Sequence, residues 1–324
     1  MAEAIALTVD GPNGPRTVRV SNPDKIYFPE LRITKLDVVR YFLSVGEGIL
    51  HALHERPTTL ERWPTGVVPG VKLTIWHGDR GKAFYQKRLP KGAPGWVETV
   101  GTASGDLFDP DQVCPTETAV VAWAASLGTL TFHSWPVRRP DVDHPDQLRI
   151  DLDPQPGTDF RHVARVAVEF RALLAALGMM GFPKTSGKRG IHVCVPIEPC
   201  WTFAEVRRGV IALGRELVSR MPDDVTISWW KKDRGQRVFL DYNQMPIASA
   251  YSIRPTPRAC VSAPVTWDEL TDVSPEDFGV VTMPARFAEL GDLHDGLADR
   301  AFSLEPLLEM ADRHERDGVG GDLP

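Results

Sequence analysis

The chain has 324 residues, 25% of them charged and 42% hydrophobic, and its net charge at pH 7 is −6. This length allows one large folded unit or two domains, and the composition is that of a soluble globular protein. The acidic balance argues against nonspecific coating of nucleic acid, although local basic clusters can still bind phosphate.

The four cysteines are far apart in the sequence and have no CxxC spacing. A zinc site or a disulfide framework is therefore not expected, and the pattern fits a reducing cytosol. No signal-peptide pattern opens the sequence, and no apolar run reaches transmembrane length. We expect a cytoplasmic protein without a membrane partner.

The first half of the chain predicts a mixture of short strands and helices. Strand-like TVRVSN (17–22) precedes an expected helix over 34–56 with Thr34 as its N-cap. The Gly- and Pro-rich stretch 64–96 indicates short strands and loops. A helix over 115–128 then leads into an alternating strand, LTFHSWPV.

The second half has a clearer pattern. It predicts strands over 148–154, 182–186, 190–197, 225–230 and 237–242, with helices over 159–178 and 202–221. Thr202 and Glu205 form a capping-box pair at the start of the second helix. The order β-α-β-β-α-β is that of the ferredoxin-like unit, so we expect a mixed sheet backed by two helices.

Two acids in the strand LRIDLDP need an explanation, because burying unpaired carboxylates is costly. Side chains two residues apart in a strand point the same way, so Asp151 and Asp153 share a face near the end of the strand. Asp241 follows an apolar run in the same way in RVFLDYNQ. Three carboxylates at one site suit hard divalent cations such as Mg²⁺ or Mn²⁺. The other interpretation is an acidic strand end that pairs with Arg149 or Arg237.

Two basic segments lie beside these strands. KTSGKRGIHV (184–193) places two cations between glycines, and its backbone N–H groups and charge suit a triphosphate although the P-loop pattern is absent. His192, just inside the following strand, favours a phosphate or sugar contact. KKDRGQR (231–237) leads into Asp241 and favours an anionic substrate. Each segment could also be an ordinary solvated turn.

The motifs DLDP, SGKRGIH and FLDYNQ together resemble the polymerase domain of bacterial ligase D, in the archaeo-eukaryotic primase superfamily. The resemblance continues in the family's order through NPDKIYFP, TKLDVVRYF, ERWPTGV, HSWP, DHPDQL, AYSIR and APVTWDEL, and it covers residues from about 20 to 300. It implies an α+β primase-polymerase fold with a ferredoxin- or RRM-like βαββαβ catalytic core and an N-terminal α/β subdomain. We expect a single unit over 1–324, with a DNA-end-binding part over about 1–130, a core over about 131–300, and a C-terminal helix and tail over 301–324.

The resemblance implies template-directed nucleotidyl transfer to 3′ ends at DNA gaps or breaks during end-joining repair, often with ribonucleotides. It implies two Mn²⁺ or Mg²⁺ ions per site, NTP or dNTP substrates, and gapped or broken DNA that carries a 5′-phosphate. No KxDG adenylation motif occurs in the sequence. We therefore expect a stand-alone, nucleoid-associated primase-polymerase, assisted by a separate DNA ligase and by end-binding repair proteins.

The resemblance also implies roles for individual residues. The catalytic, metal-binding acids are Asp151, Asp153 and Asp241. The residues around the nucleotide are His133, Ser186, Arg189, Gly190, His192, Lys231, Arg234, Gln244 and Arg254. The residues that hold the DNA 5′-phosphate or contact the template are Asn22, Lys25, Lys35, Arg62, Phe84 and Tyr85. Because Lys35 falls in the first turn of a helix, we expect the phosphate to bind free backbone N–H groups together with both ammonium groups.

Three departures from the family pattern bear on the site. Glu61 in LERWP stands where a basic residue is expected before Arg62, which weakens the case for a phosphate contact there. The loop over 67–83 is longer than usual, so the handling of DNA ends is expected to differ. The segment between Gln244 and Arg254 is shorter, which affects the alignment of Arg254.

Three other classes of function fit parts of the sequence. A metal-dependent nuclease also needs clustered acids but has no use for a triphosphate loop, so NTP-dependent primer extension separates the two. A glycosyltransferase that uses nucleotide sugars through a DxD motif would not require contacts with a DNA end. A non-catalytic break-end binding module would pair its acids with arginines, and a tight Mn²⁺ site would exclude it.

Overall fold

The computed structural model describes residues 3–74, 83–101 and 111–319. The chain folds into two compact units, and neither is continuous in sequence. Unit 1 comprises Met1–Pro140, Pro246–Ala263 and Glu276–Asp292, and unit 2 comprises Asp141–Met245, Pro264–Pro275 and Leu293–Pro324. Much of the long loop expected over 67–83 lies outside the described residues. Within the described parts of the chain, no helix is both long and apolar enough to cross a membrane.

Unit 1 is built on a mixed sheet of short strands. Its strands are β1 (Ile5–Val9), β2 (Arg16–Val20), β3 (Ile26–Phe28), β4 (Ile33–Thr34), β5 (Thr58–Arg62), β6 (Leu73–Thr74), β7 (Ala83–Gln86), β8 (Thr99–Val100), β9 (Gln112–Val113), β10 (Thr129–Ser134) and β16 (Ile247–Ala248). The main sheet has the order β16-β10-β5-β7-β6, and β9 pairs with both β5 and β8. β1 and β2 form one separate hairpin, and β3 and β4 form another.

The helices of unit 1 are α1 (Lys35–Ser44), α2 (Gly46–Leu53), α3 (Thr118–Ser126) and α6 (Met283–Leu290), with a 3-10 turn η1 (Pro29–Leu31). A second 3-10 turn, η3 (Pro275–Asp277), lies where the chain passes from unit 2 to unit 1. Thr34 caps α1 as expected, in a capping box with Asp37. The single helix expected over 34–56 is divided at Val45, whose φ of −112° and ψ of 22° are not helical. The next residue is Gly46. Any larger residue would clash here, since a Cβ would lie 2.7 Å from a methyl group of Thr118 in α3.

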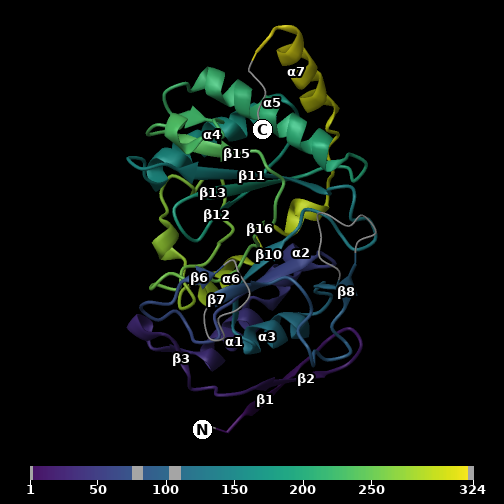
Figure 1. Cartoon of the computed structure of the whole chain (residues 1–324), viewed down its shortest axis with the longest axis vertical. Coiled ribbons are helices and arrows are strands. Elements are labelled where there is room, and N and C mark those ends of the chain that lie inside the picture. Colours follow the sequence, from purple (N-terminus) through teal and green to yellow (C-terminus); the bar gives the residue numbers. More distant parts are fainter. Residues whose placement is uncertain (1–2, 75–82, 102–110, 320–324) are drawn as a thin grey trace. The chain divides into compact units, whose positions relative to one another are not determined.

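Unit 2 has the expected ferredoxin-like core. Its strands are β11 (Gln147–Pro154), β12 (Phe182–Thr185), β13 (Ile191–Pro196), β14 (Val225–Thr226) and β15 (Val238–Asp241). Its helices are α4 (Phe160–Ala176), α5 (Phe203–Arg220) and α7 (Glu305–Arg316), with 3-10 turns η2 (Lys231–Asp233) and η4 (Asp295–Ala298). The sheet order β12-β13-β11-β15-β14 is that of a βαββαβ unit with one parallel edge strand, β14. Figure 1 shows α4 and α5 together over this sheet, with α7 beside α5.

Local sequence explains why these elements form where they do. Thr202 and Glu205 make the expected capping box at the start of α5. For α4 the N-cap is Asp159, the first residue of the expected helix, whose side chain accepts a hydrogen bond from the backbone N–H of His162. The stretch expected as a strand over 225–230 pairs only at β14, since the chain then bends into η2. The expected C-terminal helix is α7, which buries Leu307, Met310 and Ala311.

Candidate active site

The three acids expected to bind metal lie on adjacent strands of unit 2. Asp151 of β11 is the register partner of Asp241 on β15, and Asp153 lies two residues further along β11. The Asp153 side chain is exposed at the surface. Nearby protein atoms nevertheless displace water from around its carboxylate, and this desolvation, together with the charge of Asp151, raises the pKa of Asp153 to about 6. Burial also raises the pKa of Asp241, and the charge of Asp151 adds to the effect. The acids therefore repel one another, a situation that a bound cation relieves.

The three carboxylates are not arranged around a common point as the ligands of a bound metal would be. Among the residues with a described position, no three His, Cys, Asp or Glu side chains already surround one point as metal ligands would. Oδ1 of Asp241 accepts hydrogen bonds from the backbone N–H and the side-chain amide of Asn243, both at 2.9 Å. Oδ1 of Asp151 lies 3.3 Å from Nε2 of His192. The donor set is nevertheless entirely carboxylate oxygen, which is what Mg²⁺ and Mn²⁺ prefer.

His192 connects the acid Asp151 to a buried lysine. Lys184 on β12 and His192 on β13 are register partners, and Nζ of Lys184 lies 2.6 Å from Nδ1 of His192. An ammonium group can only donate, so a charged Lys184 requires Nδ1 to accept, and a neutral imidazole would then carry its proton on Nε2, the atom near Asp151. Lys184 is only 2% exposed and His192 only 4% exposed. This Lys184–His192–Asp151 chain fixes the position of one carboxylate of the site.

The loop SGKRG is a tight hairpin between β12 and β13. Oγ of Ser186 accepts the backbone N–H groups of Gly190 at 3.0 Å and of Lys188 at 3.3 Å. A Cβ on Gly190 would lie 2.6 Å from the carbonyl oxygen of Leu152, so only glycine lets the hairpin approach β11 this closely. Arg189 donates to the carbonyl oxygen of Pro154, the last residue of β11. The hairpin is therefore held directly beside the acid-bearing end of that strand.

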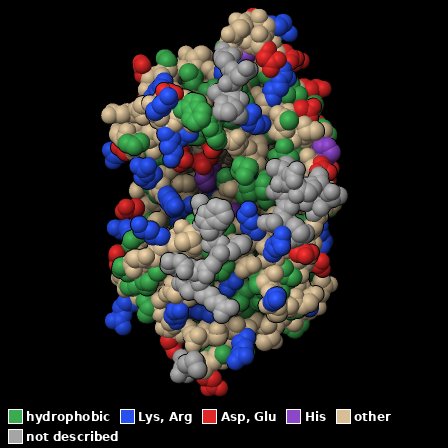
Figure 2. Space-filling view, in the orientation of Figure 1, with side chains coloured by type: hydrophobic (Ala, Val, Ile, Leu, Met, Phe, Trp, Pro, Cys, Tyr) green, Lys and Arg blue, Asp and Glu red, His purple; other side chains and the backbone are tan. Residues whose placement is uncertain are grey.

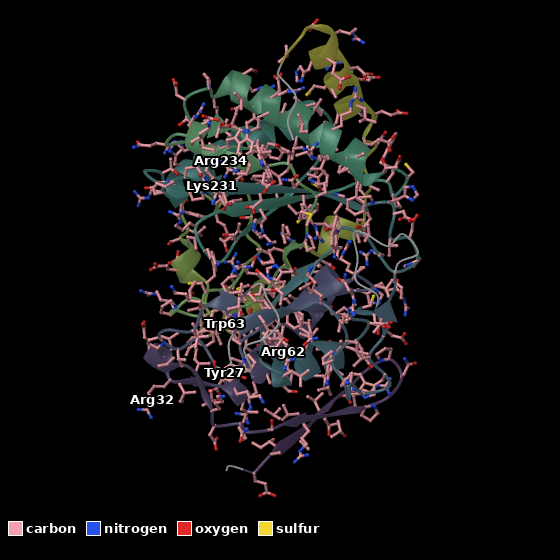
Figure 3. The ribbon with its side chains drawn as sticks, viewed as in Figure 1. Tyr27, Arg32, Arg62, Trp63, Lys231 and Arg234 are labelled. Atoms are coloured by element: carbon pink, nitrogen blue, oxygen red, sulfur yellow. The ribbon has the colours of Figure 1, made fainter. Side chains whose placement is uncertain are left out.

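The basic segment 231–237 is braced by its own arginines. Arg234 donates to the carbonyl oxygens of Ser228 and Trp229, both at 3.0 Å, and its guanidinium lies 3.3 Å from the ring centre of Phe239. Arg237 also donates to backbone carbonyl oxygens, those of Arg234, Asp233 and Pro222. Figure 3 shows Lys231 and Arg234 side by side on this segment.

Arg234 also acts on the acids through its charge. It lowers the pKa of Asp241, against the stronger raising effect of burial. Burial lowers the pKa of Arg234 itself, and the charges of Asp241 and Asp153 oppose this shift. Arg234 is thus a cation near the acids, and its expected role beside the nucleotide stays a prediction.

Gln244 has a structural task that the sequence does not reveal. Its side-chain oxygen accepts the backbone N–H of Arg149 at 2.9 Å, and its amide donates to the carbonyl oxygen of Arg149 at 3.0 Å. The side chain thus continues the ladder of β11 beyond the last paired residue of β15. Its expected role beside the nucleotide stays a prediction.

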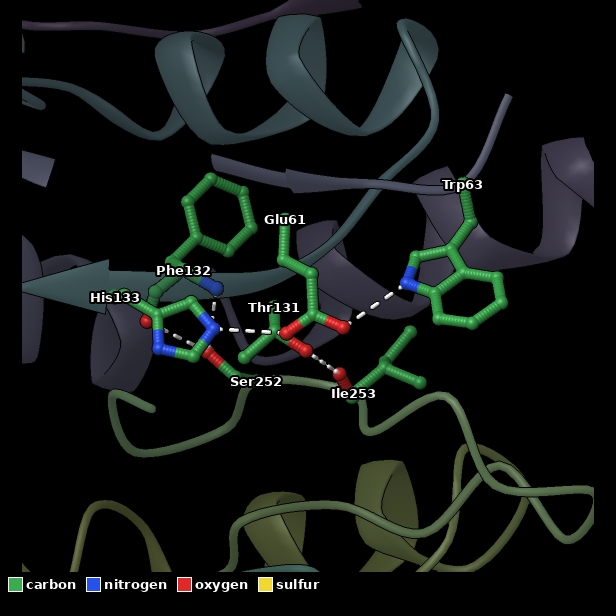
Figure 4. Close-up of polar contacts among 7 residues, drawn as sticks. All are labelled: Glu61, Trp63, Thr131, Phe132, His133, Ser252 and Ile253. Atoms are coloured by element: carbon green, nitrogen blue, oxygen red, sulfur yellow. Dashed lines mark hydrogen bonds and ion pairs between the residues drawn. The ribbon is translucent and has the colours of Figure 1, made fainter. Parts of the chain in front are cut away.

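In unit 1 a buried acid organises the other nucleotide candidates. Glu61 on β5 accepts a hydrogen bond from Nε1 of Trp63 at 3.0 Å, and its other oxygen lies 2.8 Å from Nε2 of His133 on β10 (Figure 4). The ring of Tyr85 meets the ring of His133 edge-on, with centroids 5.4 Å apart. The charge of Arg254 acts on both Glu61 and Tyr85. His133 and Arg254 therefore belong to one cluster, despite the short segment that precedes Arg254.

The two aromatic residues expected to contact the template, Phe84 and Tyr85, do not share one surface. They are successive residues of β7, so their side chains point to opposite faces of the sheet. Phe84 is the register partner of Arg62, whose guanidinium lies 5.2 Å from the Phe84 ring centre. Arg62 also donates to the carbonyl oxygen of Leu127, and Figure 3 shows it close to Trp63 and Tyr27. Phe84 thus remains a template candidate, whereas Tyr85 lies with His133.

Lys25 and Lys35 lie close together in unit 1, as the 5′-phosphate hypothesis requires. The backbone N–H of Lys35 donates to the carbonyl oxygen of Lys25 at 2.8 Å. Burial, and then the charges of Lys25 and Arg62, lower the pKa of Lys35 to about 8. Asn22 has a left-handed φ of 48°, and its carbonyl oxygen accepts the backbone N–H of Lys25. Three cations crowded together are a favourable site for an anion.

The expectation of free N–H groups at the start of α1 is wrong. The backbone N–H of Lys35 is bonded to Lys25, that of Leu36 to the carbonyl oxygen of Pro23, and that of Asp37 to Oγ1 of Thr34. A phosphate would therefore be held there by side chains.

Positive charge is also plentiful elsewhere on the surface. Figure 2 shows many Lys and Arg side chains on the visible face, although the net charge of the chain is −6.

In each unit, the role of one further residue was missed in the sequence. Lys184 could have been found, because the hairpin turn at 186–190 places residues 184 and 192 opposite each other. The contact of Glu61 with His133 depends on the pairing of β5 with β10, and no local sequence pattern predicts that pairing.

A family model identifies the class of protein to which the chain belongs. The model of the LigD primase-polymerase domain matches residues 34–294. The chain belongs to this family, as the motifs of the sequence indicated.

Known relatives agree with this assignment. The chain is 34% identical, over 91% of its length, to the multifunctional non-homologous end joining protein LigD of Mycolicibacterium smegmatis. It is 29% identical, over 83% of its length, to the bifunctional non-homologous end joining protein LigD of Bacillus subtilis. It spans 37% and 42% of those two proteins. The polymerase domain of Mycobacterium tuberculosis Ligase D in complex with DNA is similar in structure, with a TM-score of 0.75 at 29% identity, covering 87% of this chain and 98% of that one.

Proposed function

We propose that the chain is a template-directed nucleotidyltransferase that adds nucleotides, preferably ribonucleotides, to 3′ ends at gaps or breaks in DNA. The observation that carries this proposal is the pairing of Asp151 with Asp241 across β11 and β15, beside the SGKRG hairpin. An acidic rim next to a cationic turn is what a metal-bound triphosphate needs. The similarity to a polymerase domain in complex with DNA supports DNA as the template.

The acids fit a pair of Mg²⁺ or Mn²⁺ ions. Asp151, Asp153 and Asp241 would hold the metal, and a cation there would offset the repulsion that helps raise the pKa values of Asp153 and Asp241. Bound metal would activate the attacking 3′-hydroxyl and neutralise charge on the phosphates. Metal binding requires Asp153 to be ionised, so at limiting metal concentration we expect activity to fall as the pH drops below about 6, and a higher metal concentration to shift this fall to lower pH.

The remaining polar residues would position the substrates. The Ser186 hairpin with Arg189 would hold phosphate oxygens, and Arg234 would add charge at the rim of the acid site. His133 and Arg254 would contact the nucleotide, and Lys231 would contact the nucleotide or the template. Gly190 would act through the close approach of the hairpin to β11. Filling a gap leaves a nick, so a DNA ligase and end-binding repair proteins would complete the repair.

Primer extension on DNA with a short gap tests the proposal directly. The unmodified protein is supplied with each NTP or dNTP in turn, with Mn²⁺ or Mg²⁺, and the products are resolved by length. We expect templated addition that is more efficient with NTPs than with dNTPs. Degradation of the primer instead of its extension would identify a nuclease. Binding of the DNA without any change of length would identify a break-end binding module.

The hairpin gives a separate prediction. We expect Ser186→Ala to raise the KM for NTP about tenfold, because the hydroxyl organises two N–H groups of a loop that faces the phosphates. The measurement is steady-state extension with the NTP concentration varied. Ser219→Ala is the matched control, since that hydroxyl bonds only within α5 as far as the described contacts go. A weaker affinity for DNA with an unchanged KM for NTP would assign the hairpin to the template.

A further inference from the structure

Glu61 is an acid buried in the middle of a sheet. It is 2% exposed, and both of its oxygens have partners, Trp63 on one side and His133 on the other. Taking a carboxylate out of water is costly unless it is paired and hydrogen-bonded. The chain therefore retains a costly group at this position together with the partners that it requires.

The backbone around this group is firmly fixed. In the pairing of β5 with β10, Thr59 lies opposite His133 and Glu61 lies opposite Thr131, so Glu61 and His133 are diagonal neighbours. Oγ1 of Thr131 donates to the carbonyl oxygen of Ile253 at 2.6 Å, and Oγ of Ser252 accepts the backbone N–H of Phe132 at 3.1 Å. These bonds hold β10 against the segment that leads to Arg254 (Figure 4).

The groups around His133 determine which of its forms is favoured. They are Glu61 from β5, Tyr85 from β7 and, through its charge on both of these, Arg254. Burial by itself would raise the pKa of Glu61, but the hydrogen bond with His133, the charges of His133 and Arg254 and the hydrogen bond from Trp63 together outweigh burial and lower it. Glu61 is thus an anion beside the imidazole, and an adjacent anion favours the imidazolium form.

We propose that Glu61 is a positioning residue, which fixes the orientation of the His133 ring and favours its cationic form so that His133 presents positive charge to the phosphates of the incoming nucleotide. The nucleotide part of this inference rests on the proposed function. The hydrogen bond between His133 and Glu61 does not. The family pattern has a basic residue at this position, and here the positive charge would come instead from His133, held in its cationic form by Glu61.

The first test follows the protonation of His133 by NMR. The imidazole signals of the unmodified protein are titrated, and His133 is assigned by its loss in His133→Asn. We expect a pKa above the ordinary value of about 6.5, and a decrease of about one unit in Glu61→Gln, which keeps the shape of the side chain but removes its charge. Trp63→Phe is the matched control, because it removes the other hydrogen bond of Glu61 and retains the pair with His133. Should Glu61→Gln fail to fold, a pKa below about 6.5 in the unmodified protein would still overturn the inference.

The second test measures the effect on the nucleotide. At pH 8 we expect Glu61→Gln to raise the KM for NTP about tenfold with a smaller change in kcat, and the difference from the unmodified protein should shrink at pH 6, where His133 is protonated without Glu61. A loss of the same size at every pH would indicate a purely structural role and overturn the inference. A lowered pKa of His133 with an unchanged KM would overturn its nucleotide part. If the unmodified protein adds no nucleotide, the proposed function fails, while the NMR titration still decides whether Glu61 controls His133.

Discussion

Asp241→Asn is expected to reduce the rate of nucleotide addition by about 10³-fold or more, equivalent to about 4 kcal/mol of transition-state stabilisation. The substitution retains the shape of the side chain and a hydrogen-bonding oxygen for Asn243, but it removes the negative charge that would hold the metal. Asp151→Asn should have an effect of similar size. Single-turnover extension at saturating NTP and metal is the measurement.

The stability of the same variants separates a catalytic role from a structural one. Folding raises the pKa of Asp153 to about 6 and raises that of Asp241, so the folded chain binds more protons than the unfolded chain between their ordinary and folded values. This proton uptake stabilises the folded state at low pH. For Asp153, the stabilisation is lost as the pH rises through about 6. At neutral pH, Asp241→Asn removes one member of a repelling set and should leave the melting temperature unchanged or higher.

The control for these variants is Asp223→Asn, which removes an exposed acid elsewhere in unit 2. It should extend primers at the normal rate. Near-normal extension by Asp241→Asn would contradict the metal assignment. A large fall in its melting temperature would instead show that the carboxylate supports the fold, because the loss of activity would then follow from unfolding.

Much of unit 2 could be predicted because its signals are local. The strand LRIDLDP alternates, Thr202 and Glu205 cap a helix within four residues, and the βαββαβ order follows once each element is recognised. The convergence of Asp151 with Asp241 was expected from two similar strand ends, and the register confirms that they are partners. These inferences depend on spacing along the chain, which a sequence shows directly.

Other features depend on the exact path of the chain in space, and these could not be predicted. The helix is divided at Val45, next to a glycine that α3 approaches closely, and the sequence shows neither the break nor this contact. The arginines of the segment 231–237 look like solvated charge in the sequence, but they bind the carbonyl oxygens of their own loop. The free N–H groups expected in α1 are bonded to the turn that precedes the helix. In each case the competing partner is remote in sequence or has an unpredictable geometry.

The other large effect that we expect concerns the DNA end. The protein should bind gapped DNA with a 5′-phosphate at least about tenfold more tightly than the same DNA with a 5′-hydroxyl, since hydrogen bonds to charged groups contribute about 1.5–3 kcal/mol each. Lys25 and Lys35 are the proposed ligands. Nζ of Lys25 now donates to the carbonyl oxygen of Pro64, and Nζ of Lys35 to that of Ser21, both at 2.8 Å, so both ammonium groups are already held in place.

The double substitution Lys25→Ala with Lys35→Ala should abolish this preference and leave the KM for NTP unchanged on 5′-hydroxyl DNA. Arg19→Ala with Lys91→Ala removes the same charge from exposed positions elsewhere in unit 1 and should keep the preference. All affinities must be compared at one salt concentration, because phosphate contacts weaken steeply with salt. Equal affinity of the unmodified protein for the two DNAs would leave the lysines as ordinary surface charge.

The preference for DNA with a 5′-phosphate over DNA with a 5′-hydroxyl should also depend on pH, and the pH range should identify Lys35. Its pKa is lowered to about 8 by burial and by the charges of Lys25 and Arg62, so it is a cation below that pH and becomes neutral above it. The advantage of the 5′-phosphate should therefore be complete near pH 7 and decline as the pH rises above about 8, at which an ordinary exposed lysine remains charged. Binding of the phosphate raises the pKa of Lys35, which shifts the decline upward but does not reverse it. Lys35→Arg keeps its charge throughout this range, so in that variant the preference should no longer change with pH.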